Sequence, residues 1–126
     1  MADIDEQTSG SKDPVQAAAR VLENLCELEP ELKAAAIIGA EGQTVATTGS
    51  AGSWGESARE LIEALDGVRG RDVDSAHLAT DAAEIFMVRE GGLALVAVTA
   101  RFVLASLTSF DMRMALRDVA RGGKDA

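Results

Sequence analysis

The 126-residue sequence contains one cysteine, one histidine, one tryptophan, two prolines and no tyrosine. Because Cys26 is alone, no intramolecular disulfide can form, which fits a reducing compartment. Because His77 is alone, a metal site built on two histidines is excluded. No apolar run approaches the ~18 residues of a membrane-spanning helix, and residues 2–12 lack the basic and apolar regions of a signal peptide. We therefore expect a cytoplasmic protein that uses no metal or other cofactor.

Positive charge is also scarce. The chain has 21 acidic residues against 12 basic ones, which gives a formal net charge of −9. Such a surface repels the phosphates of nucleic acids and of anionic membranes, so we expect neither as a partner. The charge would attract a basic protein surface, although many proteins are acidic for solubility alone.

The composition indicates one folded domain between two short tails. Residues 1–12 and 122–126 are polar, and we expect them to be disordered. Residues 13–121 form the predicted domain. The chain is 47% hydrophobic, which is enough for a core of this size.

The first and second helices have clear start and stop signals. Pro14 begins the first, after Asp13 as N-cap, and the helix ends near Leu28. The second begins with the capping box Ser-Trp-Gly-Glu at 53–56 and is expected to end at Gly67.

The start of the last helix is ambiguous. Thr108-Ser-Phe-Asp111 resembles a capping box and favours a start near Ser109. The apolar stretch 102–105 is consistent instead with extra strand or with a first helical turn. We favour a helix from about Val103 to Arg121, with an apolar stripe along one face.

Five segments have the pattern of β-strands. Two hairpins, with turns at Glu41-Gly42 and Gly91-Gly92, pair neighbouring strands. The segments 33–40 and 93–99 are apolar throughout, which is typical of central strands. The segments 43–48 and 76–81 are half polar, which is typical of edges. The fifth strand is 85–88.

These elements define an α/β (α+β) fold in the order α-β-β-α-β-β-β-α. Placing the apolar strands centrally, with hairpin partners adjacent, gives a five-stranded, mainly antiparallel sheet in the order 2-1-5-4-3. The middle helix then covers one face and the terminal helices cover the other. Five strands span roughly 20–24 Å, whereas one helix covers about 10 Å. About half of the sheet face under the middle helix is therefore left uncovered. We expect a second copy of the chain to cover it, with the third strand of each copy paired to the third strand of the other.

At this point the chain resembles the roadblock / dynein light chain family over roughly residues 14–120. Residues 32–46, LKAAAIIGAEGQTVA, look like the family's opening of an apolar strand, a glycine turn and a second strand. Residues 85–98, IFMVREGGLALVAV, followed by Ala-Ser-Leu at 105–107 and an amphipathic helix, look like its second half.

The resemblance implies a fold of the roadblock/profilin-like type. It also implies a homodimer with a joined sheet and paired second helices. Similar bacterial proteins regulate small Ras-like GTPases, and eukaryotic relatives are dynein subunits, so the implied role is a regulator or scaffold of a small GTPase. A bacterial source fits the Ala-, Arg- and Gly-rich composition. We expect the dimer or partner interface to include Trp54, Arg59, Leu61, Leu65, His77, Leu78 and Thr80.

Catalytic interpretations find little support in the residues present. Cys26 lies on the apolar stripe of the first helix, where a free cysteine commonly packs in the core. The glycine loop 49–55 lacks the G-K-[ST] end of a P-loop. Arg59 lies on a polar helix face, where contact with a partner is a better interpretation than an arginine finger. Asp81, Glu84 and Asp111 have no acid/base pair spacing. We expect no enzyme.

Two questions stay open at the level of sequence. Trp54 could pack in the core as a helix staple or anchor an interface, because aromatic residues are enriched at binding hot spots. A profilin-like small-molecule sensor is the alternative function. The lack of polar groups clustered among the apolar strand residues argues against such a pocket.

Overall fold

The structure, a computed structural model, describes residues 14–48, 54–70 and 73–121. Its elements follow the predicted order, with boundaries shifted by a few residues. They are α2 (Pro14–Leu28), β1 (Leu32–Ile38), β2 (Thr44–Thr47), α3 (Trp54–Arg69), β3 (Ser75–Ala79), β4 (Glu84–Glu90), β5 (Leu93–Thr99) and α4 (Ala105–Ala120). The predicted tails, the Asp13 cap, Ser53 of the capping box and most of the 49–55 loop lie outside the described residues.

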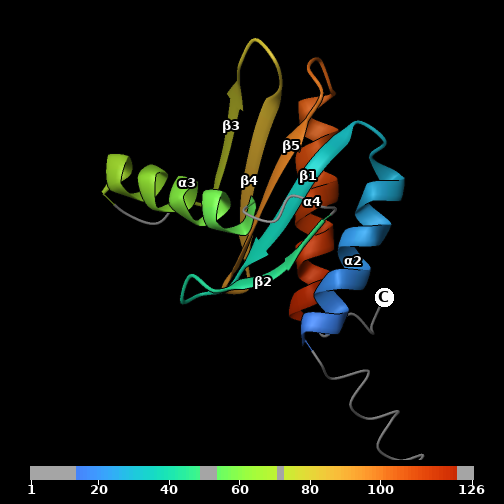
Figure 1. The fold of residues 1–126 in the computed structure, drawn as a ribbon, viewed down its shortest axis with the longest axis vertical. Helices are drawn as coiled ribbons and strands as arrows, with labels where there is room; N and C mark the ends of the chain where they lie inside the picture. Colours follow the sequence, from blue (N-terminus) through green and yellow to red (C-terminus); the bar gives the residue numbers. More distant parts are fainter. Residues whose placement is uncertain (1–13, 49–53, 71–72, 122–126) are drawn as a thin grey trace, which may run out of the picture.

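The five strands form one sheet in the order β2-β1-β5-β4-β3, and every neighbouring pair is antiparallel. Helices α2 and α4 lie side by side on one face, and α3 lies on the other at a steep angle to the strands (Figure 1). The predicted fold class, strand order and placement of the helices are confirmed.

The sequence predicted that helix α3 ends at Gly67, and this prediction is wrong. Gly67 does not have a positive φ, and its backbone stays helical within α3. The helix continues to Arg69, and the left-handed residue that follows is Gly70, with φ of +72°. The N–H of Gly70 donates to the carbonyl of Asp66 at 2.8 Å and closes the last turn.

Helix α4 begins at Ala105, between the two predicted starts. Its N-cap, Leu104, offers no side-chain hydrogen bond. The predicted capping residue Thr108 is instead buried, and its hydroxyl points towards Glu29, at the end of α2, at 3.4 Å. The Thr-Ser-Phe-Asp pattern therefore marks a helix-to-helix contact and not a helix start.

The larger part of the core lies between the sheet and the α2/α4 layer. Both helices place an apolar stripe on the same sheet face, as their ~3.6-residue period predicts. Phe86 at the centre of β4 is 1% exposed. The buried members of this core are Ala18, Val21, Leu22, Leu25, Ala35, Ile37, Phe86, Val88, Leu95, Ala97, Met112, Leu116 and Val119.

A smaller core lies under α3. This helix packs chiefly against β1 and β2, so it covers only part of its face of the sheet. Ala58 and Ile62 are its buried contacts. The sheet contributes Ala36, Ile38, Met87, Ala94 and Val96 to this core.

Candidate interaction surface

One row of apolar side chains crosses the sheet on the α3 face without being covered. Leu78 pairs with Ile85, Ile85 with Val98, and Val98 with Ala34, so the four residues stand in register across β3, β4, β5 and β1. Leu78 is 38% exposed and the other three are half-buried. We call these four residues the open row. It is the part of the sheet that the sequence expected one helix to leave bare.

The open row ends at a free sheet edge. Strand β3 pairs with β4 alone among the described strands. Four of its five residues are exposed, and the fifth, Ala76, is half-buried. An unpaired strand edge is a ready template for another strand. Apolar surface and backbone edge therefore meet at one corner of the molecule.

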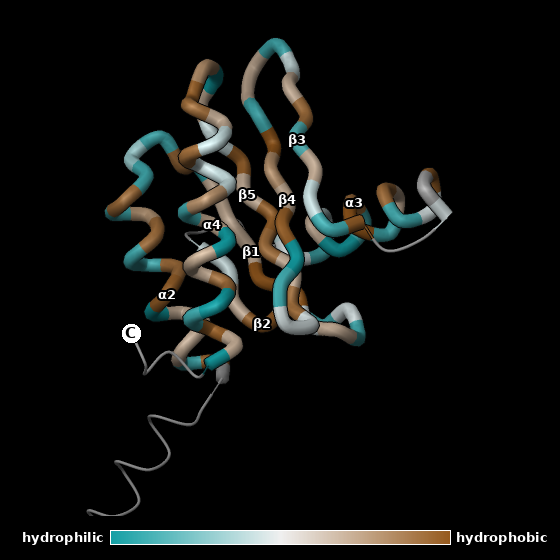
Figure 2. The backbone as a smooth tube through the Cα atoms, turned by 180° about the vertical axis from the view of Figure 1, so that it is seen from behind, coloured by the Kyte–Doolittle hydropathy of each residue, from teal (hydrophilic) through white to brown (hydrophobic). Residues whose placement is uncertain are grey.

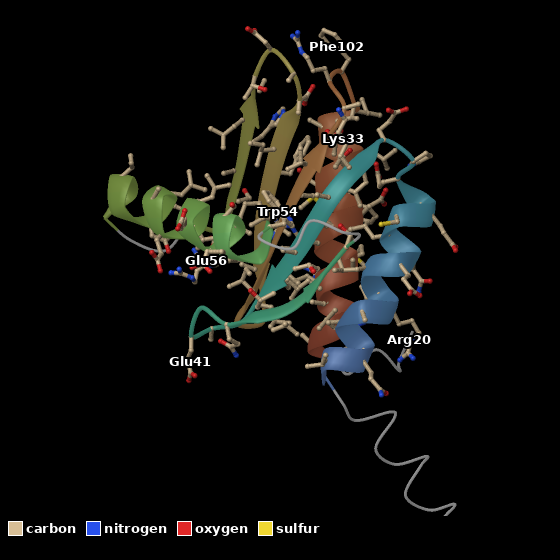
Figure 3. The ribbon with its side chains drawn as sticks, in the orientation of Figure 1. Arg20, Lys33, Glu41, Trp54, Glu56 and Phe102 are labelled. Carbon is tan, nitrogen blue, oxygen red and sulfur yellow. The ribbon has the colours of Figure 1, made fainter. Side chains whose placement is uncertain are left out.

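Trp54 lies at the end of α3 that is next to the sheet (Figure 3). Its ring is half-buried and packs on the smaller core. Its indole Nε1 is buried and makes no hydrogen bond within the part of the chain that the structure describes. A buried tryptophan N–H normally finds a partner. The packing of the Trp54 ring supports a role in the core, and its unpaired N–H donor supports a role as an interface anchor. Both interpretations of Trp54 from the sequence therefore stay open.

The other predicted residues on α3 and β3 have different surroundings. Leu61 and Leu65 are half-buried and pack beside Trp54 on the smaller core. Thr80 lies in the β3–β4 turn, where its hydroxyl accepts from the N–H of Ala83 at 3.0 Å and donates to the Ala83 carbonyl. Thr80 therefore shapes the turn.

His77 lies on the opposite face of the sheet from Leu78. Its ring stacks on Phe86 with centroids 4.3 Å apart, on the α2/α4 side. Its Nε2 is 2.7 Å from a carboxylate oxygen of Glu84, which is buried at 7% exposure. The sequence spacing gave Glu84 no acid/base partner, and the structure places His77 beside it. The predicted set of interface residues is therefore divided between two faces.

Glu84 also fixes the loop between β5 and α4. Its second oxygen accepts the backbone N–H of Phe102 at 2.6 Å. Phe102 has φ of +67°, a left-handed conformation that is costly for an aromatic residue. Hydrogen bonds from His77 and from Phe102 hold the pKa of Glu84 below its ordinary value. The buried carboxylate thus links the edge strand to the start of α4, where Phe102 lies at the end of the molecule (Figure 3).

An open cleft of 640 Å³ lies at the other end of the sheet, between α3 and the two hairpin turns. Arg59 lines it and donates to Glu56 and Glu63 of its own helix, each at 2.8 Å. These carboxylates raise the pKa of Arg59. Because two carboxylates already hold the guanidinium, Arg59 is not poised as a free arginine finger.

A second arginine in the cleft forms a clip that the sequence did not reveal. Arg89 of β4 makes a two-point ion pair with Asp66 of α3, at 2.9 and 2.8 Å. Arg89 also donates to the carbonyl of Val73, and Asp66 accepts the N–H of Val73. The hydrogen bond from Arg89 is the main cause of a lowered pKa at Asp66. The clip fixes the end of α3, the segment after it and β4 to one another.

Replacing Asp66 with asparagine is expected to lower the free energy of unfolding by about 1 kcal/mol at pH 7, because a two-point ion pair becomes a single hydrogen bond from the arginine to a neutral amide oxygen, and solvent partly screens the charges that are lost. The ion pair stabilises the fold above the ordinary carboxyl pKa and is lost as Asp66 protonates, so the difference from wild type shrinks in acid. Urea unfolding of wild type and variant at pH 7 and pH 3 measures the loss of stability and its decrease in acid. Glu63→Gln on the same helix is the control. An equal loss of stability in Glu63→Gln would contradict the claim that the Arg89–Asp66 pair stabilises the fold.

The described residues hold little that suggests covalent chemistry. Burial, followed by the nearby Glu23 and Glu27, raises the pKa of the Cys26 thiol, which keeps it in its less nucleophilic form. No group of three His, Cys, Asp or Glu side chains in residues 14–48, 54–70 and 73–121 could hold a metal ion. No helix in the same residues is long and apolar enough to cross a membrane.

Solved structures with the same fold identify its class. The gliding protein MglB from Thermus thermophilus is similar at a TM-score of 0.70 and 15% identity, covering 90% of this chain and 93% of that one. A Roadblock/LC7 domain from Streptomyces avermitilis is similar at 0.66 and 19%, covering 79% and 92%. Profilin IB of Acanthamoeba castellanii is similar at 0.54 and 18%, covering 79% and 93%.

The fold is therefore of the roadblock/profilin type, which confirms the predicted resemblance at the level of structure. No family model and no curated protein matches the sequence. At these identities the similarity concerns the fold.

Proposed function

We propose that this chain is a non-catalytic, homodimeric interaction module that regulates or scaffolds a small Ras-like GTPase. The observation that carries the proposal is the open row beside the free edge of β3. One two-fold operation brings a second β3 against the first and lays the second α3 over the open row. Both exposed features are then covered in one step.

The dimer also gives roles to residues on α3. Leu61 and Leu65 lie half-buried on the side of the smaller core and would meet the second copy as the two α3 helices approach. Trp54 lies at the start of the same helix, with its unused N–H donor. Aromatic residues with a polar tip are typical anchors of protein interfaces.

The GTPase partner follows from the roadblock resemblance together with the shared fold. The test is to load small Ras-like GTPases of the source organism with GDP or with a non-hydrolysable GTP analogue and to measure their binding to this chain by fluorescence anisotropy. We expect one GTPase to bind, with a preference for one nucleotide state. Failure of every GTPase in both states would contradict the proposal for the partner and leave the dimer to be tested separately.

A small-molecule sensor is the second candidate, because the cleft between α3 and the hairpins offers a cavity of sufficient size. Its two arginines, Arg59 and Arg89, are already paired with carboxylates, so an anionic ligand would have to displace Glu63 or Asp66. A metabolite that copurifies with the wild type and not with Arg59→Ala would favour the sensor over the interaction module.

A further inference from the structure

Helix α4 carries a second apolar stripe on the side that faces away from the sheet. Leu107, Phe110 and Met114 are exposed there, with Phe110 exposed to 59%. At ~100° per residue they lie opposite the residues that α4 buries. Figure 2, which shows α4 in front of the sheet, has hydrophobic stretches recurring along this helix. The buried residues are Thr108, Met112, Leu116 and Val119.

Core packing does not account for this stripe. The chain has three phenylalanines, and two of them, Phe102 and Phe110, are exposed on the segment that contains the stripe. Leu104 is exposed on it as well. A contiguous run of large apolar side chains in water indicates a surface that another molecule covers.

Opposite charges border the two sides of the stripe. By helical periodicity Arg113 and Arg117 follow one side, and Asp111 and Asp118 follow the other. On the arginine side Glu90 of β4 lies 3.5 Å from Arg113 and 2.8 Å from Arg117. On the aspartate side Asp118 is 3.9 Å from Arg121, the C-cap of the helix, and Asp111 lies near Glu29, just after α2.

The sequence of the stripe fits a short heptad seam. With Leu107 at position a, Phe110 falls at d and Met114 at the next a, while Arg117 at the following d ends the apolar seam and donates to Glu90 of its own chain. Arg113 is then at g and Asp118 at the following e. In a parallel pair of helices each g residue faces the e residue of the next heptad on the partner, and opposite charges there fix the orientation.

We propose that a second copy of this chain covers the stripe, with the two α4 helices packed in parallel about a two-fold axis along their length. Leu107, Phe110 and Met114 meet their own symmetry mates at the seam. Arg113 then faces Asp118 of the partner subunit, on both sides of the axis. An antiparallel pair would set the flank that carries Arg113 against the same flank of the partner helix, so the charges at the g and e positions favour the parallel arrangement.

This interface is separate from the dimer of the proposed function. It lies on the α2/α4 face, whereas the open row lies on the α3 face. A molecule with both contacts assembles beyond two copies, either into a closed group or into an open chain, depending on how the two axes meet. Each contact can therefore be removed without the other.

The first test is sedimentation velocity at 1–100 μM. Phe110→Glu is expected to lower the mass at least twofold relative to wild type, while Val15→Glu, an exposed apolar residue at the start of α2, leaves it unchanged. Combining Phe110→Glu with Leu78→Glu is expected to give single chains. An unchanged mass for Phe110→Glu overturns the α4 interface and says nothing against the open row.

The second test is a charge exchange. Arg113→Asp or Asp118→Arg alone places like charges together and is expected to weaken self-association about tenfold. The double variant restores opposite charges with reversed sign and is expected to recover near wild-type association. Failure of the double variant to recover would overturn the parallel arrangement.

The third test is disulfide trapping after Cys26→Ser removes the native thiol. Met114→Cys and Leu107→Cys should each form homodimeric disulfides, because a residue at position a meets its own mate only in a parallel pair. Asn24→Cys, exposed on α2, is the control. Phe110-dependent binding of the wild type to phosphatidylglycerol vesicles, without trapping at either position, would assign the stripe to lipid and overturn the proposal.

Discussion

Replacing Leu78 with glutamate is expected to raise the dissociation constant of the proposed open-row dimer at least tenfold. Leu78 is the most exposed member of the open row, at the edge where the second copy joins. Burying a leucine is worth about 1.5–3 kcal/mol, and a carboxylate at a closed apolar seam adds a desolvation cost. A loss of about 2 kcal/mol corresponds to roughly 30-fold in affinity.

Sedimentation equilibrium in the Phe110→Glu background measures this constant without interference from α4. The matched control is Ser75→Glu, which places the same charge on the same exposed strand but on the opposite face. Circular dichroism checks that both variants are folded. Equal association of Leu78→Glu and Ser75→Glu would count against the open row as the seam.

Replacing Glu29 with glutamine is expected to stabilise the protein above pH 7. Glu29 is buried between the end of α2 and α4, beside Thr108 and Asp111. Burial, and then the neighbouring Asp111, raises the pKa of Glu29 from 4.5 to about 7. Ionising it in the folded state costs at most about 3 kcal/mol, and solvent screening reduces this to roughly 1–2 kcal/mol.

The sign of the pH dependence follows from proton linkage. Between pH 4.5 and 7 the folded chain holds a proton on Glu29 that the unfolded chain has lost, so wild-type stability falls as the pH rises through this window. Glutamine carries no charge, so the advantage of Glu29→Gln is full above pH 7 and disappears below about pH 4.5. Urea unfolding from pH 4 to 8 tests this. The control is Glu31→Gln on the exposed turn that follows, and a Glu29→Gln protein less stable than wild type at pH 8 would refute the account.

The strand order could be predicted because local patterns determined it. Apolar runs marked β1 and β5 as central, and the two glycine turns forced their neighbours to pair. Strand β4 was expected at 85–88 but extends to Glu90. Its polar end looked like loop because the partners of Arg89 and Glu90, which are Asp66 and Arg117, lie more than 20 residues away.

The surface was less predictable than the fold. The placement of His77 and Leu78 on opposite faces of the sheet could have been predicted, because adjacent residues of a strand face opposite sides of a sheet. The pairing of Glu84 with the backbone of Phe102 could not, because it depends on where a distant loop ends. The Glu29–Thr108 contact, 79 residues apart in sequence, was hidden by a local pattern that resembled a helix cap.

The outer stripe of α4 is present in the sequence but is not recognisable there as an exposed surface. Met112, Leu116 and Val119 gave a complete apolar face for the core, so Phe110 and Met114 were not needed to explain the helix. A helix with two apolar faces is recognised only after the structure shows which one is buried.

The central claim is that the open row and the edge of β3 are completed by a second copy. Sedimentation velocity of the Phe110→Glu variant from 1 to 100 μM tests it most directly, because only the first interface remains. The account predicts a species of two chains that Leu78→Glu dissociates. A single chain at every concentration, with the variant folded, would contradict it.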